Sequence, residues 1–129
     1  MCYHPRSEIE PYLVTAEQMQ QIEGQLFKSG MPVAALMENV AARLTNWFVR
    51  HYSKYQKREK RTARSTGGVL AGPGHNGGDA LVVARELHHQ GFDIQIYQPF
   101  SKVKPLTQQH AQYAKSLKIT FVSSVESLV

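Results

Sequence analysis

A glycine-rich octapeptide, residues 72–79, holds the residues best suited to binding a small ligand. It reads Gly-Pro-Gly-His-Asn-Gly-Gly-Asp, and its glycines at positions 72, 74 and 77 match a G-x-G-x-x-G spacing. Such a spacing permits a tight turn and the close approach of a ligand to bare backbone, and N–H groups at a following helix start attract anions. We therefore expect the octapeptide to face a phosphate, a ribose or a bound ion. The alternative is a tight turn whose Asp79 only caps a helix.

The segments around the octapeptide predict a strand before it and a helix after it. The short apolar run 69–71 follows the breaker Gly67-Gly68 and is typical of a buried strand. After Asp79, apolar residues recur at helical spacing, and Gly91 is placed to end that helix. The order strand, glycine loop, helix is that of a nucleotide-binding α/β unit.

Two common classes of glycine-rich nucleotide-binding loop are disfavoured. A Walker A loop has Lys and Ser or Thr directly after its last glycine, whereas Gly77 is followed by Gly78 and Asp79. A dehydrogenase fingerprint needs an acid at the end of the second strand to hold the ribose hydroxyls, but no Asp or Glu lies between Asp93 and Glu126. Neither a P-loop NTPase nor an ordinary NAD-dependent dehydrogenase is expected.

Two helices are predicted before the central strand. The first begins at Thr15 with a capping box to Gln18 and carries an apolar stripe that we expect to pack in the core, and Gly30 ends it. The second starts near Pro32 and has a wide apolar face, expected against the sheet or another subunit. The stripe of the first helix is Met19, Ile22 and Leu26, and the face of the second is Val33, Leu36, Met37, Val40, Ala41, Leu44 and Phe48. Glu38 and Asn39 beside this face lie either in solvent or beneath the glycine loop.

The second half of the chain alternates strands and helices. Residues 93–97 alternate as a strand, residues 106–117 have helical spacing after Pro105, residues 119–122 form a third strand, and Ser123-Ser124 could cap another helix. This alternation predicts a Rossmann-like, three-layer α/β fold with a parallel sheet. Because such a fold binds its ligand in a crevice between strand ends, a sheet of three strands predicts a domain that is incomplete at its C-terminal side.

Composition indicates a single domain or part of one, spanning residues 1–129. The net charge of +5 is local, since residues 50–64 contain seven basic residues and one acid. We interpret residues 1–14 as an extended arm and residues 50–66 as a solvated basic connector, with binding to a phosphate backbone as the less favoured interpretation. The only cysteine is Cys2 and the six histidines do not cluster, so no disulfide or zinc site is expected. A cytoplasmic protein without a membrane span is predicted.

Three motifs in order resemble the YjeF N-terminal family, the NAD(P)H-hydrate epimerases. They are Val14-Thr15 with Gln18-Met19 and Ile22, then Leu36-Met37-Glu38-Asn39, then the octapeptide with Leu81-Val82 and Ala84-Arg85-Leu87. The family's loop usually reads Asn-Asn-Gly-Gly-Asp-Gly, where this chain has His75 first and Ala80 last. The resemblance implies an enzyme that interconverts the R and S epimers of hydrated NADH and NADPH.

The resemblance also implies roles for particular residues. His75, Asn76, Gly77, Gly78 and Asp79 would contact the damaged nucleotide, and Asn76 would help to hold a potassium ion. The implied functional partner is an NAD(P)H-hydrate dehydratase, which bacteria often fuse to the epimerase. The family's later aspartate-containing segments do not occur here, so the catalytic acid or base is unknown and we expect half a site with little or no turnover.

One alternative function comes from the same family. Its fold also serves as a non-catalytic scaffold that binds RNA or a protein partner, and the basic residues 50–64 are the best support for that function. The preserved Asn76-Gly77-Gly78-Asp79 favours the enzyme. A homodimer through the apolar face of the second helix is one expectation, and cover of Trp47 and Phe48 by the absent half of the domain is the alternative. Lys102 and Lys104, near the end of the second strand, hint at recognition of a 2′-phosphate.

Overall fold

The computed structural model describes residues 13–56 and 65–128, and the chain divides into two compact units, Met1–Val33 and Ala34–Val129. The described part of the first unit is helix α2 (Ala16–Lys28), which starts as the sequence predicts. Thr15 N–H donates to Gln18 Oε1 at 2.8 Å, and Gln18 N–H donates to Thr15 Oγ1 at 3.2 Å. Its apolar stripe, Met19, Ile22 and Leu26, is 42–44% exposed, and the expected core packing of α2 stays a prediction.

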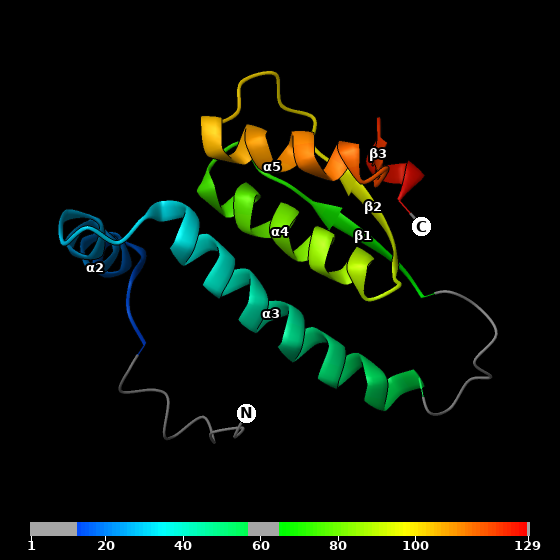
Figure 1. The fold of residues 1–129 in the computed structure, drawn as a ribbon, viewed down its shortest axis with the longest axis horizontal. Coiled ribbons are helices and arrows are strands. Elements are labelled where there is room, and N and C mark those ends of the chain that lie inside the picture. Colours follow the sequence, from blue (N-terminus) through cyan, green and yellow to red (C-terminus); the bar gives the residue numbers. More distant parts are fainter. Residues whose placement is uncertain (1–12, 57–64, 129) are drawn as a thin grey trace. The chain divides into compact units, whose positions relative to one another are not determined.

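The second unit holds the predicted alternation of strands and helices (Figure 1). Its elements are α3 (Val33–Gln56), β1 (Thr66–Leu70), α4 (His75–His89), β2 (Asp93–Tyr97), α5 (Pro105–Ser116), β3 (Thr120–Val122) and the 3₁₀ turn η2 (Val125–Ser127). Strand β2 has the predicted bounds. Ser124 precedes only the short η2, so the last predicted helix is a single 3₁₀ turn.

Three predicted boundaries are corrected. Strand β1 begins at Thr66 and includes both glycines that we interpreted as a breaker, because the parallel ladder to β2 runs through both positions. Helix α4 begins at His75 and not after Asp79, so the last five residues of the octapeptide are helical. Helix α3 continues to Gln56, so the predicted connector 50–66 begins as a helix. Residues 57–64 and 1–12, which carry the rest of that connector and most of the expected arm, lie outside the described residues.

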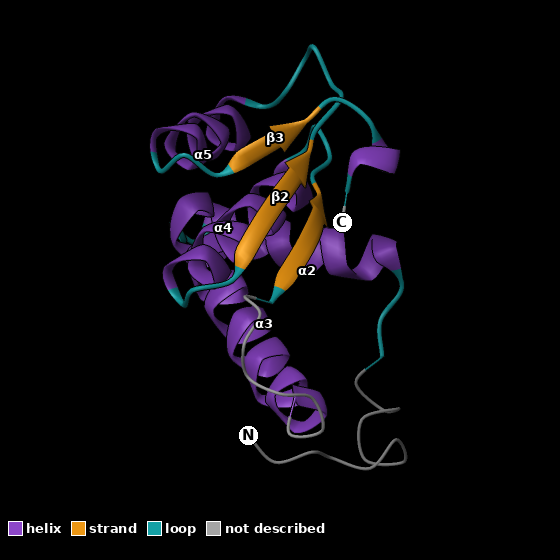
Figure 2. Cartoon of the chain, turned by 90° about the vertical axis from the view of Figure 1, so that its right-hand side faces the viewer, coloured by secondary structure: helices purple, strands orange, loops and turns teal. Residues whose placement is uncertain are grey.

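The sheet is parallel, with the strand order β1-β2-β3. Helices α4 and α5 cover one face of it, and η2 lies on the other side (Figure 2). The described residues thus form the sheet and one helical layer of the three layers expected for a Rossmann-like fold. The strand order does not reverse among the described strands, so a crevice at a reversal point is not part of them.

The core lies between the sheet and α4 and α5. Its largest fully buried apolar side chains include Leu81, Val82 and Ile96. Helix α5 presents Thr107, Ala111 and Ala114 to this core. Their small side chains allow α5 to pack closely against α4.

Helix α3 buries only part of its predicted apolar face. Met37, Ala41 and Thr45 are buried, and Met37 and Ala41 form a small cluster with Val82 of α4. On the adjacent face, Leu44 is 50% exposed and Trp47 is 47% exposed. Farther along α3, Trp47 stacks on His51, with ring centroids 4.1 Å apart, and Phe48 stacks on Tyr52. Phe48 and Tyr52 both meet Phe92 edge to face.

Helices α2, α4 and α5 end in the same hydrogen-bonded turn, a Schellman motif. After α4, Gly91 N–H donates to His88 O and Phe92 N–H donates to Leu87 O. The left-handed residue of the motif is a glycine after two of the helices, as the sequence predicts: Gly30 after α2 and Gly91 after α4. After α5 the left-handed residue is Lys118, with φ 61°. Among the described helices, none is both long and apolar enough to cross a membrane.

Candidate functional site

The glycine loop lies at the carboxyl end of β1 and leads into the first turn of α4. Two groups from beyond β2 fix its backbone, since Lys104 N–H donates to Pro73 O at 2.9 Å and Thr107 Oγ1 donates to Gly74 O at 2.8 Å. The Thr107 side chain is completely buried. The loop is thus tied to the start of α5, and both helix N-termini lie at the carboxyl end of the sheet.

The glycines of the loop serve two different needs. Gly77 and Gly78 are buried, and a Cβ atom on Gly77 would lie 1.9 Å from Gly72 O. A Cβ on Gly78 would lie 2.5 Å from Met37 Cε. A Cβ on Gly72 or Gly74 would meet no atom within 4 Å. Internal packing therefore requires glycine at position 77, where a Cβ would meet backbone, whereas at Gly78 the end of the flexible Met37 side chain would have to shift. The open backbone that a ligand can approach belongs to Gly72 and Gly74.

The helix start offers fewer N–H groups to an anion than the sequence suggests. Gly77 N–H and Gly78 N–H both donate to Gly74 O, at 3.0 and 3.4 Å. The amides of His75 and Asn76 precede them, in the positions that an α-helix leaves without an internal acceptor. Asp79 is the fifth residue of α4 and lies beyond the first turn, where the helix dipole is strongest.

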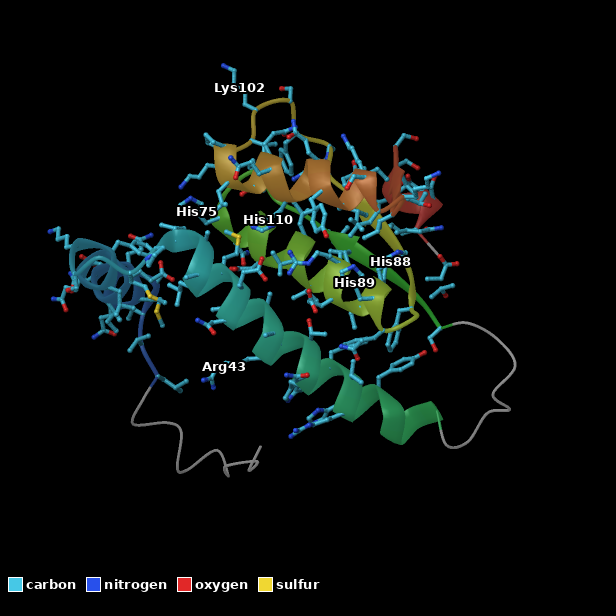
Figure 3. All side chains as sticks on the ribbon, viewed as in Figure 1. Arg43, His75, His88, His89, Lys102 and His110 are labelled. Atoms are coloured by element: carbon cyan, nitrogen blue, oxygen red, sulfur yellow. The ribbon has the colours of Figure 1, made fainter. Side chains whose placement is uncertain are left out.

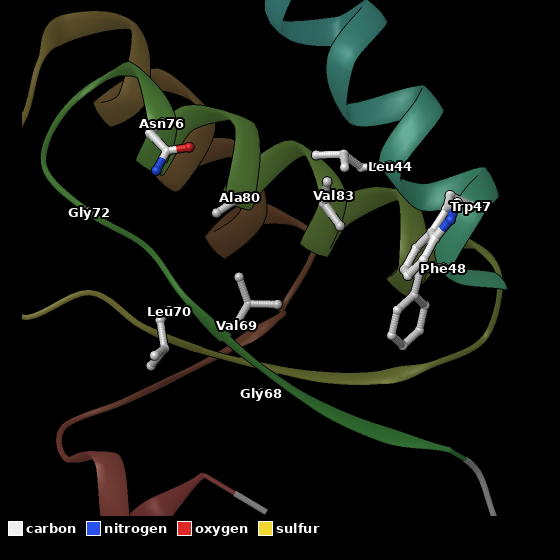
Figure 4. A pocket seen from close by; sticks show the side chains of 10 residues that line it. All are labelled: Leu44, Trp47, Phe48, Gly68, Val69, Leu70, Gly72, Asn76, Ala80 and Val83. Carbon is white, nitrogen blue, oxygen red and sulfur yellow. The ribbon is translucent and has the colours of Figure 1, made fainter. Parts of the chain in front are cut away.

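A cavity of about 390 Å³ lies beside the loop, between β1, α4 and α3 (Figure 4). Its walls are mostly apolar, and Asn76 brings the one polar side chain among its lining residues: Leu44, Trp47, Phe48, Gly68, Val69, Leu70, Gly72, Asn76, Ala80 and Val83. Of the five predicted nucleotide contacts, only Asn76 lines this cavity. Contact of His75, Gly77, Gly78 and Asp79 with a nucleotide stays a prediction.

The predicted potassium ligand is also Asn76. Its amide oxygen suits a hard cation, but one such oxygen is not a complete coordination shell. In the part of the chain that the structure describes, no three or more His, Cys, Asp or Glu side chains gather as metal ligands. Binding of potassium at Asn76 therefore stays a prediction.

The remaining sequence-predicted residues lie apart from one another (Figure 3). His75 is at the start of α4, whereas His88 and His89 are in its last turn. Lys102 lies in the loop before α5, with Lys104 at the α5 N-cap. The structure thus places His75 and both lysines at the carboxyl end of the sheet and the histidine pair at the opposite end of α4.

An ion-pair network that sequence reasoning missed joins α3 to α4. Arg85 donates to both carboxylate oxygens of Glu38, at 3.1 and 2.7 Å, and also to Glu86 Oε1. These hydrogen bonds from Arg85 hold the pKa of Glu38 below its ordinary value, and Glu38 in turn raises the pKa of Arg85. Glu38 is therefore exposed and paired with Arg85, and it does not lie beneath the glycine loop.

His110 lies near this network on α5. Its Nε2 atom is buried and has no hydrogen-bond partner in the described structure. Burial lowers the pKa of His110, and the nearby Glu38 carboxylate opposes that shift. The contacts of His110 and Thr107 could not be predicted from the sequence, because a single polar residue in a helix does not indicate which neighbouring element it will face.

Known proteins match the part of the chain that contains the glycine loop. The family model described as YjeF-related protein N-terminus matches residues 33–128. A bifunctional NAD(P)H-hydrate repair enzyme of Thermosynechococcus vestitus is 51% identical over 118 residues, which are 92% of this chain and 22% of that protein. An NAD(P)H-hydrate epimerase of Fusarium vanettenii is 39% identical over 61 residues, 47% of this chain and 26% of that protein.

A solved structure shares the fold. The crystal structure of the yeast protein ynu0 superposes with a TM-score of 0.76 at 25% identity, covering 89% of this chain and 48% of the yeast chain. The chain thus spans about half of that structure and about a fifth to a quarter of the two enzymes. The family match begins where the second compact unit begins and includes the whole glycine loop. This chain belongs to the YjeF-related protein N-terminus family.

Proposed function

We propose that this chain supplies the nucleotide-binding half of an NAD(P)H-hydrate epimerase, which interconverts the R and S forms of hydrated NADH or NADPH. The observation that carries the proposal is the glycine loop, residues 72–79, placed between the end of β1 and the start of α4 within the family match. The printed names of the relatives, a repair enzyme and an epimerase of hydrated NAD(P)H, supply the reaction.

The loop can bind a nucleotide without an acidic residue that holds the ribose hydroxyls. The open backbone of Gly72 and Gly74 allows a phosphate or ribose to approach, and the amides of His75 and Asn76 point along the helix axis toward it. Lys104 and Lys102, near the same end of the sheet, add positive charge for a 2′-phosphate. NADHX and NADPHX are therefore both candidate substrates, and NADPHX gains more from the lysines.

Catalysis requires a group that the described residues do not identify. Epimerisation at a hydrated nicotinamide needs a positioned acid or base. Asp79 and His75 are the titratable residues of the loop, and we assign neither as catalytic. The proposed half-site therefore binds substrate, with turnover dependent on residues from the remaining part of the domain and on a dehydratase that consumes the S form. Potassium stays a candidate cofactor, with Asn76 as one ligand.

The test measures binding and turnover separately. Binding of NADPH and of R-NADPHX to this chain is followed by isothermal titration calorimetry, and epimerisation is followed in a coupled assay with a separate dehydratase, with and without potassium. We expect binding that Asp79→Ala weakens and that His89→Ala, at the exposed far end of α4, leaves unchanged. We expect little turnover by the chain alone.

Each outcome is decisive. Absence of nucleotide binding would contradict the proposed function. Potassium-dependent turnover by the isolated chain would establish the reaction and show that residues 1–129 contain the catalytic groups, which would overturn the half-site part of the proposal.

A further inference from the structure

His110 is a titratable residue with a buried nitrogen that the proposed function does not use. It lies on α5, where this helix faces α4 (Figure 3). Its Nε2 atom is buried and has no hydrogen-bond partner among the described residues. A neutral imidazole can leave one nitrogen unpaired, whereas an imidazolium places a charged N–H donor there, and a buried charged donor without an acceptor costs far more free energy. The site therefore favours the neutral ring over the protonated one.

The charges that face His110 from the neighbouring helices do not remove this cost. Burial is the largest effect on the pKa of His110 and lowers it, the Glu38 carboxylate of α3 raises it, and the Arg85 guanidinium of α4 lowers it again. Both carboxylate oxygens of Glu38 already accept hydrogen bonds from Arg85, which also pairs with Glu86. The Arg85 guanidinium carbon lies 5.9 Å from the centre of the Tyr113 ring, so this positive charge is held over α5. Together these effects keep the pKa of His110 below its ordinary value of 6.5.

The start of α5 connects His110 to the glycine loop. Thr107 precedes His110 by three residues, so the two side chains lie on the same side of the helix. Thr107 is completely buried, and its Oγ1 donates to Gly74 O at 2.8 Å. Lys104 N–H, at the N-cap of α5, donates to Pro73 O at 2.9 Å. The start of α5 cannot move away from α4 without breaking these hydrogen bonds to the loop.

The chain before α5 and the packing of α5 allow such a movement. Residues 98–104, which connect β2 to α5, form neither helix nor strand. The first turns of α5 can therefore shift while β2 stays in the sheet. The buried residues of α5 are small, namely Thr107, Ala111 and Ala114. Because each of them buries little apolar surface, the first turns lose little hydrophobic stabilisation when they move.

We propose that His110 makes the contact between α5 and the glycine loop sensitive to acid: protonation of its ring moves the start of α5 away from α4 and breaks the Thr107–Gly74 hydrogen bond. This movement brings the Nε2 atom into water, which hydrates the imidazolium. It also removes the two donors that α5 provides to the loop, so the loop opens more often. The inference concerns the conformation of the loop, and it does not depend on the reaction proposed above.

The pH range of this opening follows from the direction of the pKa shift. Because the pKa of His110 in the folded chain is lower than its ordinary value of 6.5, the opened form binds the proton more readily. The stabilisation of the closed form is therefore fully present above pH 6.5 and is lost as the pH falls through the lower folded-state pKa. The pKa of Glu38 is lowered from 4.5, so protonation of the Glu38–Arg85 pair occurs in a separate, more acidic range.

Hydrogen exchange of the whole chain tests this opening without a nucleotide. Protection factors, which correct for the pH dependence of chemical exchange, are measured at Lys104 and at Gly77 and Gly78, whose amides donate to Gly74 O. Between about pH 7.5 and about pH 5.5 these factors should fall at least about threefold, while those of the central strand β2 change much less. An NMR titration of the His110 imidazole protons should have its midpoint in the same pH range.

Substitutions separate His110 from other groups that titrate. His110→Gln removes the titrating ring and should abolish the pH dependence of these protection factors. His89→Gln, at an exposed position in the last turn of α4, is the matched control and should retain it. Glu38→Gln removes a carboxylate that favours the imidazolium, so it should enlarge the fall. Circular dichroism shows whether each variant folds, and the titration of the unmodified chain decides the question if His110→Gln does not fold.

Three results would overturn the inference. They are loop protection factors that do not change with pH in the unmodified chain, the same fall in His110→Gln, and a fall that β2 shares equally. The last result would show that acid opens the whole fold and not the start of α5. Because no nucleotide is present in these measurements, failure of this inference is distinguishable from failure of the proposed epimerase function.

Discussion

The carbonyl oxygen of Gly72 lies where Gly77 would carry its Cβ atom, 1.9 Å from that position. The loop turns so tightly that the backbone before it contacts the first turn of the helix after it. The last glycine of the G-x-G-x-x-G pattern is thus required by contact between two parts of the protein, and any ligand must approach from the side of Gly72 and Gly74.

Gly77→Ala should severely destabilise the fold, because the added methyl group must displace backbone and not a flexible side chain. Overpacking of this kind costs about 1–3 kcal/mol or more. Gly74→Ala is the matched control, since its Cβ would meet open space and its φ of −91° suits any residue. Urea unfolding of both variants checks the difference. Equal midpoints for Gly77→Ala and Gly74→Ala would contradict this interpretation.

Thr107→Val should destabilise the chain by about 0.5–1.5 kcal/mol, because it removes the hydroxyl hydrogen bond to the Gly74 carbonyl, which still accepts from the Gly77 and Gly78 amides. Thr107→Ser keeps the hydroxyl and should retain most of the stability, with a smaller loss for the deleted methyl group. Thermal unfolding monitored by circular dichroism measures both changes. If the serine and valine variants unfold at the same temperature, the hydroxyl does not stabilise the loop.

Glu38→Gln should lower stability by up to about 1 kcal/mol at neutral pH, the range for a partly exposed ion pair. The Arg85 hydrogen bonds depress the folded-state pKa of Glu38 below its ordinary value of 4.5. The contribution is therefore fully present above about pH 4.5 and is lost as the pH falls through the lower folded-state pKa. Unfolding free energies of both proteins between pH 3 and 7 test this, and a difference that persists unchanged at pH 3 would contradict it.

Lys118→Gly should stabilise the chain, because Lys118 takes the left-handed conformation, with φ 61°, that ends α5. A left-handed L-residue costs about 1–2 kcal/mol, and the greater freedom of glycine in the unfolded chain offsets part of the gain. The matched opposite change is Gly91→Ala, at φ 90°, which should destabilise. Denaturant midpoints that move the same way for both variants would show that backbone conformation at these positions does not decide stability.

The local signals in the sequence predicted those features that short segments determine by themselves. The Thr15–Gln18 capping box, the bounds of β2 and the left-handed glycines at positions 30 and 91 are all confirmed. The strand-loop-helix order around the octapeptide is confirmed as well. Each depends on hydrogen bonds or dihedral angles within a few residues, so distant parts of the chain do not change the outcome.

Features that depend on distant contacts were not predictable. The core role of Met19, Ile22 and Leu26 stays a prediction, because an amphipathic stripe records a preference for burial and not the identity of its partner. The Glu38–Arg85 pair and the Thr107–Gly74 bond join residues 47 and 33 positions apart, and no local pattern marks such pairs. The roles of Gly77 and Gly78 required knowing where Gly72 and Met37 would lie.

The close contact between Met37 and Gly78 has a consequence for chemical ageing of the protein. The thioether sulfur lies 2.6 Å from a Cβ position at Gly78, and Met37 is only 3% exposed. Conversion to the sulfoxide would place a polar oxygen atom in this buried, apolar contact. Peroxide can therefore reach this sulfur mainly in molecules that have opened, and each molecule oxidised there would refold less readily.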